Sequence, residues 1–139
     1  MTAAPPRAVL ADDERLMREQ LRARLAEAWP ELQLVAEAKN GAEAVALVAE
    51  HRPDVVFLDI RMPGLTGVET TRQLTGIAPH TRVVVLTISV DDDAVMDAVM
   101  AGACGYLLKD SSIDQLIAGI RAAAGGESLI SPHIAAKLL

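Results

Sequence analysis

The chain has 139 residues, of which 51% are hydrophobic and 23% charged, which favours one globular domain with a substantial core. Its net charge of −6 argues against a chain that binds nucleic acid or another polyanion by itself. The single cysteine excludes an internal disulfide and fits the reducing cytoplasm. No apolar run approaches the roughly 20 residues that span a bilayer, so no membrane partner is expected.

Short apolar runs alternate with amphipathic segments along the chain. In chain order, the pattern predicts a strand at 7–12, a helix at 13–29, a strand at 31–38, a helix at 40–51, a strand at 54–59, a helix at 66–76, a strand at 82–87, a helix at 91–103, a strand at 105–109 and a helix at 111–126. The strands are continuously apolar, as in "RVVVLT", which indicates a parallel sheet buried on both faces. With right-handed crossovers, five such units form a doubly wound α/β sheet.

The last residues, 127–139, read "ESLISPHIAAKLL" and follow the two glycines that end the last predicted helix. Ser131 followed by Pro132 is typical of a helix start, with a capping residue and then proline at the first helical position. We interpret 1–126 as the folded domain and 127–139 as a linker with the start of a helix that leads to a further, absent domain. The alternative is a native C-terminal helix.

Polar side chains end four of the five predicted strands. Asp12 and Asp13 follow the first strand, Asp59 ends the third, Thr87 the fourth and Lys109 the fifth. Each alone is ordinary, since a strand-end Asp is usually a turn former or a helix cap. In a doubly wound sheet, however, ligands bind beyond the carboxyl ends of the strands. We therefore expect the three carboxylates to share one shallow crevice.

Three carboxylates in a small volume repel one another unless a cation lies between them. Few carboxylates with several retained waters suit Mg²⁺, and Lys109 supplies a second positive charge. A metal, a lysine and a hydroxyl around a carboxylate form an oxyanion clamp for a phosphoryl group. Asp59 is the best candidate nucleophile, giving an aspartyl phosphate, because it ends the central-looking strand before a flexible turn.

Four motifs carry a resemblance to a known family: "LADDE", "VVFLDIRMPG", "VVVLT" and "AGACGYLLKD". In order and spacing they resemble the receiver domain of bacterial two-component response regulators, over roughly residues 7–126. The resemblance implies a flavodoxin-like sheet with strand order 2-1-3-4-5. It also implies that Asp59 is the phosphoacceptor. Asp13 and Asp59 would bind Mg²⁺ directly with the backbone carbonyl of Arg61, and Asp12 would help through water.

The same resemblance implies a switch and a set of partners. Thr87 would hydrogen-bond the phosphoryl group, Lys109 would pair with it, and Tyr106 would turn inward when Thr87 moves. Plain packing is the alternative role for Tyr106. A sensor histidine kinase would donate the phosphoryl group, and a phosphorylation-dependent homodimer would form. The tail resembles the linker before a LuxR-type helix-turn-helix, so DNA would be bound only through that missing output domain.

Two positions depart from the family pattern. Ile88 follows Thr87 where a small residue is usual, so it is expected to narrow access for small phosphoryl donors. Thr66 stands where Asp is common. We expect little from that change, since Pro63, Gly64 and Gly67 still make the turn.

Three other functions are alternatives to a non-enzymatic signalling domain. A pseudo-receiver that only dimerises or binds proteins stays open because of Ile88. A haloacid-dehalogenase-type phosphatase would need a second acid two residues after the nucleophile, where this chain has Arg61. A flavodoxin-type mononucleotide module would need a glycine-rich phosphate loop, which the sequence lacks.

Overall fold

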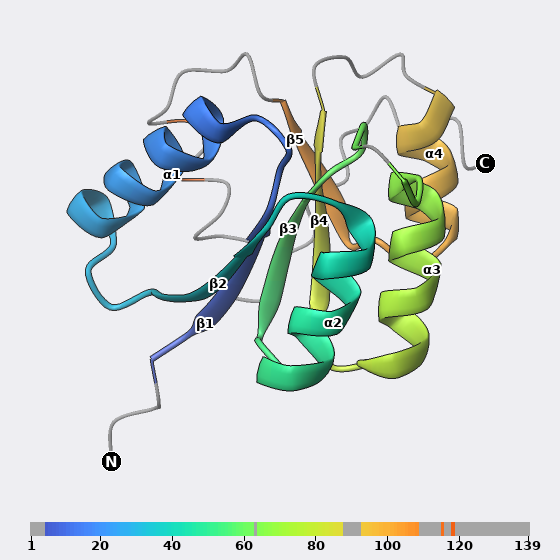
Figure 1. Ribbon diagram of the computed structural model, residues 1–139, viewed down its shortest axis with the longest axis horizontal. Helices are drawn as coiled ribbons and strands as arrows, with labels where there is room; N and C mark the ends of the chain where they lie inside the picture. The colour runs from blue at the N-terminus through green and yellow to red at the C-terminus, as the bar shows by residue number, and fades with distance from the viewer. Residues whose placement is uncertain (1–4, 63, 88–92, 109–114, 116–117, 119–139) are drawn as a thin grey trace.

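The computed structural model describes residues 5–62, 64–87, 93–108, 115 and 118. Its centre is a sheet of five parallel strands in the order β2-β1-β3-β4-β5 (Figure 1). The strands are β1 (Arg7–Ala11), β2 (Gln33–Ala38), β3 (Val55–Asp59), β4 (Arg82–Thr87) and β5 (Gly105–Leu108). This confirms the predicted α/β class, the parallel sheet and the order 2-1-3-4-5. Right-handed crossovers on opposite faces of the sheet lead the chain from β1 outward to β2 and then back past β1 to β3. This places β2 at the edge and β3 in the centre.

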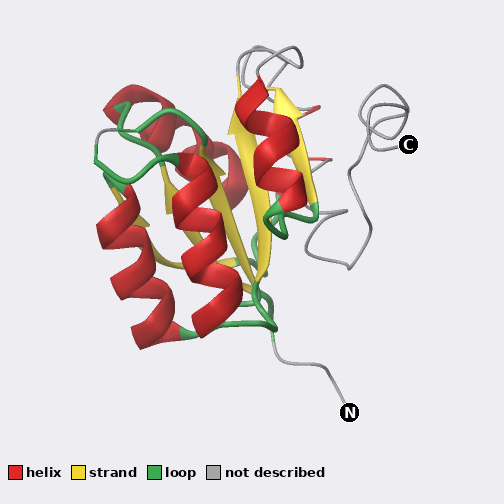
Figure 2. Cartoon of the chain, turned by 90° about the vertical axis from the view of Figure 1, so that its right-hand side faces the viewer, coloured by secondary structure: helices red, strands yellow, loops and turns green. Residues whose placement is uncertain are grey.

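Helices cover both faces of the sheet, as the continuously apolar strands predicted. They are α1 (Arg15–Ala28), α2 (Gly41–His51), α3 (Gly67–Ile77) and α4 (Asp93–Met100). Figure 1 shows α1 on one side of the sheet and the other three on the opposite side, and Figure 2 shows this second layer turned toward the viewer. Of the predicted helix at 111–126, residues 115 and 118 are described, and both are helical. The tail at 127–139 lies outside the described residues.

Two apolar clusters pack on the two faces because successive strand residues point to opposite sides. Val9, Val56 and Val85 face α2, α3 and α4. Leu10 and Phe57 face α1, together with other buried residues of the second cluster, namely Ala8, Leu21, Leu25, Val55, Val84 and Leu86. β3 is buried along its whole length, including its last residue. That burial fixes the position of Asp59 at the carboxyl end of β3.

Side-chain caps set where two of the helices begin. The Asn40 side chain accepts a hydrogen bond from the backbone N–H of Glu43 at 2.8 Å, so the predicted start of α2 is confirmed. The Thr66 hydroxyl accepts one from the N–H of Glu69 at 3.0 Å and caps α3. A hydroxyl oxygen thus does at this position what a carboxylate oxygen would do.

α3 contains threonines, which have low intrinsic helix propensity, and their packing explains why the helix forms. Thr70 and Thr71 are both buried between α3 and its neighbours. The Thr71 hydroxyl donates to the carbonyl of Gly67 at 2.7 Å, which satisfies it within the helix. Burial in the layer therefore outweighs the low intrinsic helix propensity of threonine. Within the described part of the chain, no helix is long and apolar enough to cross a membrane.

Candidate functional site

Three aspartates meet at the carboxyl edge of the two central strands. Asp12 and Asp13 directly follow β1, and Asp59 is the last residue of β3. These strands are neighbours in parallel register, with Ala11 opposite Leu58. One carboxylate oxygen from each aspartate lies within 4.8 Å of one from each of the others. The predicted gathering of the three acids is therefore present in the structure.

The three acids differ in their exposure to solvent. Asp12 is fully buried and Asp59 is 4% exposed, whereas Asp13 is exposed. One oxygen of each carboxylate lies within 4.8 Å of the other two, so the three ionised groups repel one another unless a positive charge lies close. Hard divalent cations take carboxylate oxygens as ligands, and the exposed side of Asp13 leaves room for water ligands. The donor set therefore fits a metal ion.

Backbone hydrogen bonds fix the directions of the two buried carboxylates. One oxygen of Asp12 accepts from the N–H of Glu14 at 2.8 Å, which forms a tight turn before α1. The Asp12 N–H donates to the carbonyl of Ala38 at 3.0 Å, extending the pairing with β2. One oxygen of Asp59 accepts from the N–H of Arg61 at 3.1 Å. Both carboxylates are thus held before any ligand binds.

Thr87 lies on β4, next to the strand that carries Asp59, and Tyr106 lies on β5, one strand farther out. Asp59 pairs with Leu86 in the register of β3 and β4, so Thr87 stands one residue farther toward the same edge. Thr87 is 1% exposed. Tyr106 pairs with Val85 of β4 and is buried in the cluster that packs under α4. Both residues therefore lie at or below the carboxyl edge, while Lys109 and Ile88 lie outside the described residues.

The polar residues at the strand ends do not predict an arginine–glutamate pair that lies beside the acids. Glu37 is the next-to-last residue of β2 and pairs with Leu10. Arg18 of α1 donates from Nη1 to the backbone carbonyl of Asp12 at 2.5 Å, and its Nε lies 3.6 Å from Glu37. A glutamate inside the otherwise apolar "LVAEA" was the available signal. Spacing alone did not indicate that it meets an arginine of α1.

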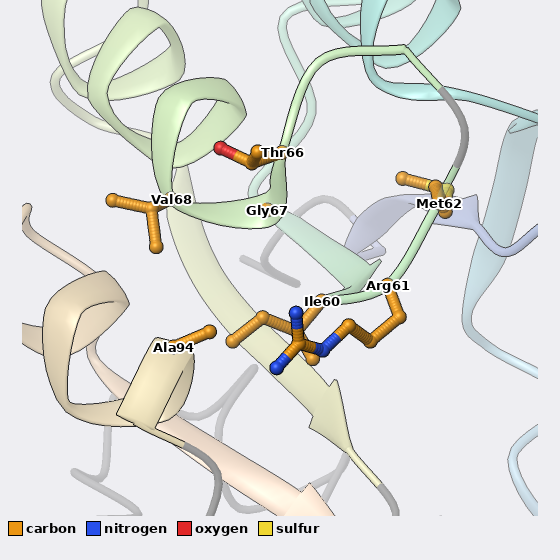
Figure 3. Close-up of a pocket in the computed structure, with 7 residues that line it drawn as sticks. All are labelled: Ile60, Arg61, Met62, Thr66, Gly67, Val68 and Ala94. Atoms are coloured by element: carbon orange, nitrogen blue, oxygen red, sulfur yellow. The ribbon is translucent and has the colours of Figure 1, made fainter.

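A separate cavity of about 290 Å³ lies beside the acid cluster, between the turn after β3 and the start of α4 (Figure 3). None of the three aspartates lines it. Its walls are largely apolar and consist of Ile60, Arg61, Met62, Thr66, Gly67, Val68 and Ala94. The acid cluster and the cavity therefore adjoin the same turn, Asp59–Arg61, but the cluster is acidic and the cavity is largely apolar.

Comparisons with known proteins agree with this geometry. The family model of the response regulator receiver domain matches residues 8–121. The chain is 39% identical over 133 residues to the transcriptional regulatory protein LiaR of Bacillus subtilis, covering 96% of this chain and 63% of LiaR. It is 40% identical over 130 residues to the DNA-binding transcriptional activator DevR/DosR of Mycobacterium tuberculosis, covering 94% and 59%. The chain spans about three fifths of the length of these relatives.

The fold also matches solved structures. A LuxR-family two-component response regulator from an Aurantimonas species superimposes with a TM-score of 0.83 at 36% sequence identity. That match covers 94% of this chain and 92% of the other. The sequence comparison and the fold comparison thus both match bacterial regulatory proteins.

Proposed function

The chain belongs to the response regulator receiver family, and from its site we propose that it is a switch controlled by phosphorylation of Asp59. The observation that carries the proposal is the cluster of Asp12, Asp13 and Asp59, whose carboxylate oxygens lie within 4.8 Å of one another. Among these, Asp59 combines the end of a central strand with a carboxylate oriented by the Arg61 N–H. Because the chain belongs to this family, the phosphatase and the flavodoxin-type module are no longer candidate functions.

The proposed step is phosphotransfer from a phosphohistidine of a sensor histidine kinase. A carboxylate oxygen of Asp59 attacks the phosphorus, the P–N bond to the donor imidazole breaks, and the imidazole leaves with the electron pair and takes up a proton. Asp12, Asp13, Asp59 and the Arg61 carbonyl are the groups that would hold Mg²⁺. When bound, Mg²⁺ neutralises the charge of the acids and of the phosphoryl oxygens. Lys109 would pair with the same oxygens.

Phosphorylation would act on the fold through Thr87 and Tyr106. The new dianion on Asp59 attracts the Thr87 hydroxyl, one residue past the register position opposite Asp59. Tyr106 is already buried in the apolar cluster with Val95 and Ala98 of α4, so a shift of Thr87 would change how its ring packs under α4. The surface around α4 and β5 then changes between two states. We propose that this surface controls a homodimer.

The output of the switch would lie beyond the receiver domain. We propose that residues 1–126 form this domain and that 127–139 link it to a LuxR-type helix-turn-helix. The relative DevR/DosR is a DNA-binding transcriptional activator, and the matched region spans 59% of it. With a net charge of −6, the present chain would not itself bind DNA. A histidine kinase donor and a single cysteine fit a cytoplasmic location.

The test is phosphotransfer to matched variants. The chain is incubated with acetyl phosphate or a phosphorylated kinase in the presence of Mg²⁺, and the intact mass is measured. Wild type should gain one phosphoryl group and Asp59→Asn none. Asp97→Asn makes the same change at an exposed position on α4 and should be labelled like wild type. Equal labelling of Asp59→Asn and wild type would exclude Asp59 as the acceptor.

The pseudo-receiver alternative has its own outcome in this experiment. If neither a kinase nor acetyl phosphate labels wild type, and beryllofluoride with Mg²⁺ leaves the Tyr106 environment unchanged, the chain binds partners without a phosphoryl switch. Labelling by a kinase but not by acetyl phosphate would instead indicate restricted access, the effect expected of Ile88.

A further inference from the structure

Arg18 connects three elements at the acid cluster. It is the fourth residue of α1, and its side chain is 13% exposed. Its Nη1 donates to the backbone carbonyl of Asp12 at 2.5 Å, while its Nε lies 3.6 Å from a carboxylate oxygen of Glu37 on β2. One guanidinium therefore joins α1, the end of β1 and the edge strand. Arginine suits this position because its planar fork presents several donors in fixed directions.

Glu37 is itself held from two sides. Its second carboxylate oxygen accepts a hydrogen bond from Arg22 Nη1 at 2.9 Å, one helical turn after Arg18. The Glu37 side chain is only 25% exposed, so this pairing is partly shielded from solvent. Arg18 is thereby held on its Glu37 side, and its contact with the Asp12 carbonyl is a charge-assisted hydrogen bond with little freedom.

The carbonyl that Arg18 holds belongs to the peptide that leads into Asp13. The Asp13 side chain is exposed, so packing does little to orient it. Its direction depends on the plane of the Asp12–Asp13 peptide. That peptide is fixed at its carbonyl by Arg18 and, one residue earlier, by the bond from the Asp12 N–H to Ala38 at 3.0 Å. A rotation there would move the Asp13 carboxylate away from Asp12 and Asp59.

We propose that Arg18 is a positioning residue for the divalent cation, acting through the Asp12–Asp13 peptide rather than through its charge. This inference rests on the proposed function, since it concerns the same cation site. Groups that orient metal ligands typically change metal affinity about 10- to 100-fold when removed. Because Arg18 acts through a backbone carbonyl, we expect a change of roughly threefold to tenfold.

The sign of the effect separates positioning from electrostatics. Removing a positive charge near three carboxylates would, by charge alone, make the site more attractive to Mg²⁺ and tighten binding. Losing the orientation of Asp13 would weaken binding instead. The two mechanisms therefore predict opposite changes in affinity for the same substitution.

Mg²⁺ titration of the chain by calorimetry tests this inference with two substitutions at one position. Arg18→Met keeps the length of the side chain and removes its donors and charge, and its Mg²⁺ affinity should fall roughly threefold to tenfold. Arg18→Lys keeps the charge but replaces the planar fork with a single donor nitrogen, so its Mg²⁺ affinity should lie between those of wild type and Arg18→Met.

The matched control is Arg22→Met, which removes the same charge from the same helix. Arg22 is 56% exposed and contacts Glu37 but has no hydrogen bond to the acid cluster, and without it Glu37 still pairs with Arg18 through its other oxygen. Exposed ion pairs contribute little, so its Mg²⁺ affinity should stay within about twofold of wild type. Thermal unfolding of every variant identifies global destabilisation, which would not by itself change the affinity of the folded chain.

Two results would overturn the inference: an unchanged or higher Mg²⁺ affinity in Arg18→Met, or an equal loss in Arg22→Met. If Arg18→Met does not fold, Arg18→Lys decides: weaker binding than wild type supports positioning, and wild-type affinity contradicts it. A wild-type chain that binds no Mg²⁺ would count against the cation in the proposed function. That outcome is distinct from failure of the Arg18 comparison, which needs a measurable wild-type affinity.

Discussion

Replacing Gly67 with alanine should destabilise the fold at the turn that presents Asp59. Gly67 is the first residue of α3, and a Cβ built there would lie 2.7 Å from the Cα of Ile60 and 2.8 Å from its carbonyl oxygen. Ile60 directly follows Asp59, and its own N–H donates to the Leu86 carbonyl at 3.0 Å. Backbone atoms cannot turn aside as a flexible side chain can, so helix and turn must move apart.

The size of the effect follows from the contact and the length of the chain. Overpacking of a tight contact destabilises by about 1–3 kcal/mol, and the lower backbone entropy of alanine in the unfolded state offsets some of this. We expect a net loss of about 1–2 kcal/mol. With about 2.1 cal/mol/K of unfolding entropy per residue, a chain of 139 residues loses roughly 3 °C in Tm per kcal/mol. The Tm of Gly67→Ala should therefore fall by about 3–7 °C.

Gly76→Ala is a matched control on the same helix. A Cβ at Gly76 meets no atom within 4 Å, and the residue is exposed. Alanine there should stabilise α3 by up to about 0.5 kcal/mol, since glycine is the poorer helix former. Thermal unfolding followed by far-UV circular dichroism, with urea denaturation at 25 °C as a second measure, compares the two variants.

The reasoning predicts opposite signs for two identical substitutions. A Gly67→Ala variant as stable as wild type would show that α3 and the turn separate freely. Equal destabilisation by Gly76→Ala would show that helix propensity, not the contact with Ile60, decides the outcome. Either result would refute the argument from close packing.

Two further predictions concern the cap of α3 and the cysteine. Thr66→Ala should lower the free energy of unfolding by about 1 kcal/mol in urea denaturation, whereas Thr66→Asp, which keeps an acceptor for the Glu69 N–H, should remain near wild type. Burial raises the pKa of the Cys104 thiol, against the opposing positive charge of Arg82. Since the thiolate is the reactive form, alkylation by iodoacetamide at pH 8 should be slower in the folded chain than in urea. It should accelerate as pH rises; equal rates in both states would contradict the effect of burial.

The apolar pattern predicted the sheet because burial on both faces leaves a direct trace in the residues. Runs such as "VVFLD" have no polar side to turn toward solvent, so the two-sided arrangement of helices followed. The cluster of acids was equally accessible from the sequence. Parallel strands bring their carboxyl ends to one edge, and Asp12, Asp13 and Asp59 stand directly at such ends.

Other features depended on contacts that local patterns do not record. Threonine is a poor helix former, yet α3 forms because Thr70 and Thr71 are buried in the layer formed by α2 and α3. Glu37 looked like an ordinary strand residue. Its pairing with Arg18 and Arg22 exists because α1 crosses back over the sheet beside β2.

The sequence by itself determined the order of the elements, the buried strands and the three carboxylates at one edge, because these follow from local composition and strand direction. Local turns orient the Asp12 and Asp59 carboxylates, and tertiary structure alone decided the longer-range contacts that support them. The carbonyl of Asp12 meets Arg18 across helix and sheet, and Gly67 lies against Ile60 where no side chain would fit. These contacts join residues whose separation in sequence carries no periodic signal, so only the packed fold brings them together.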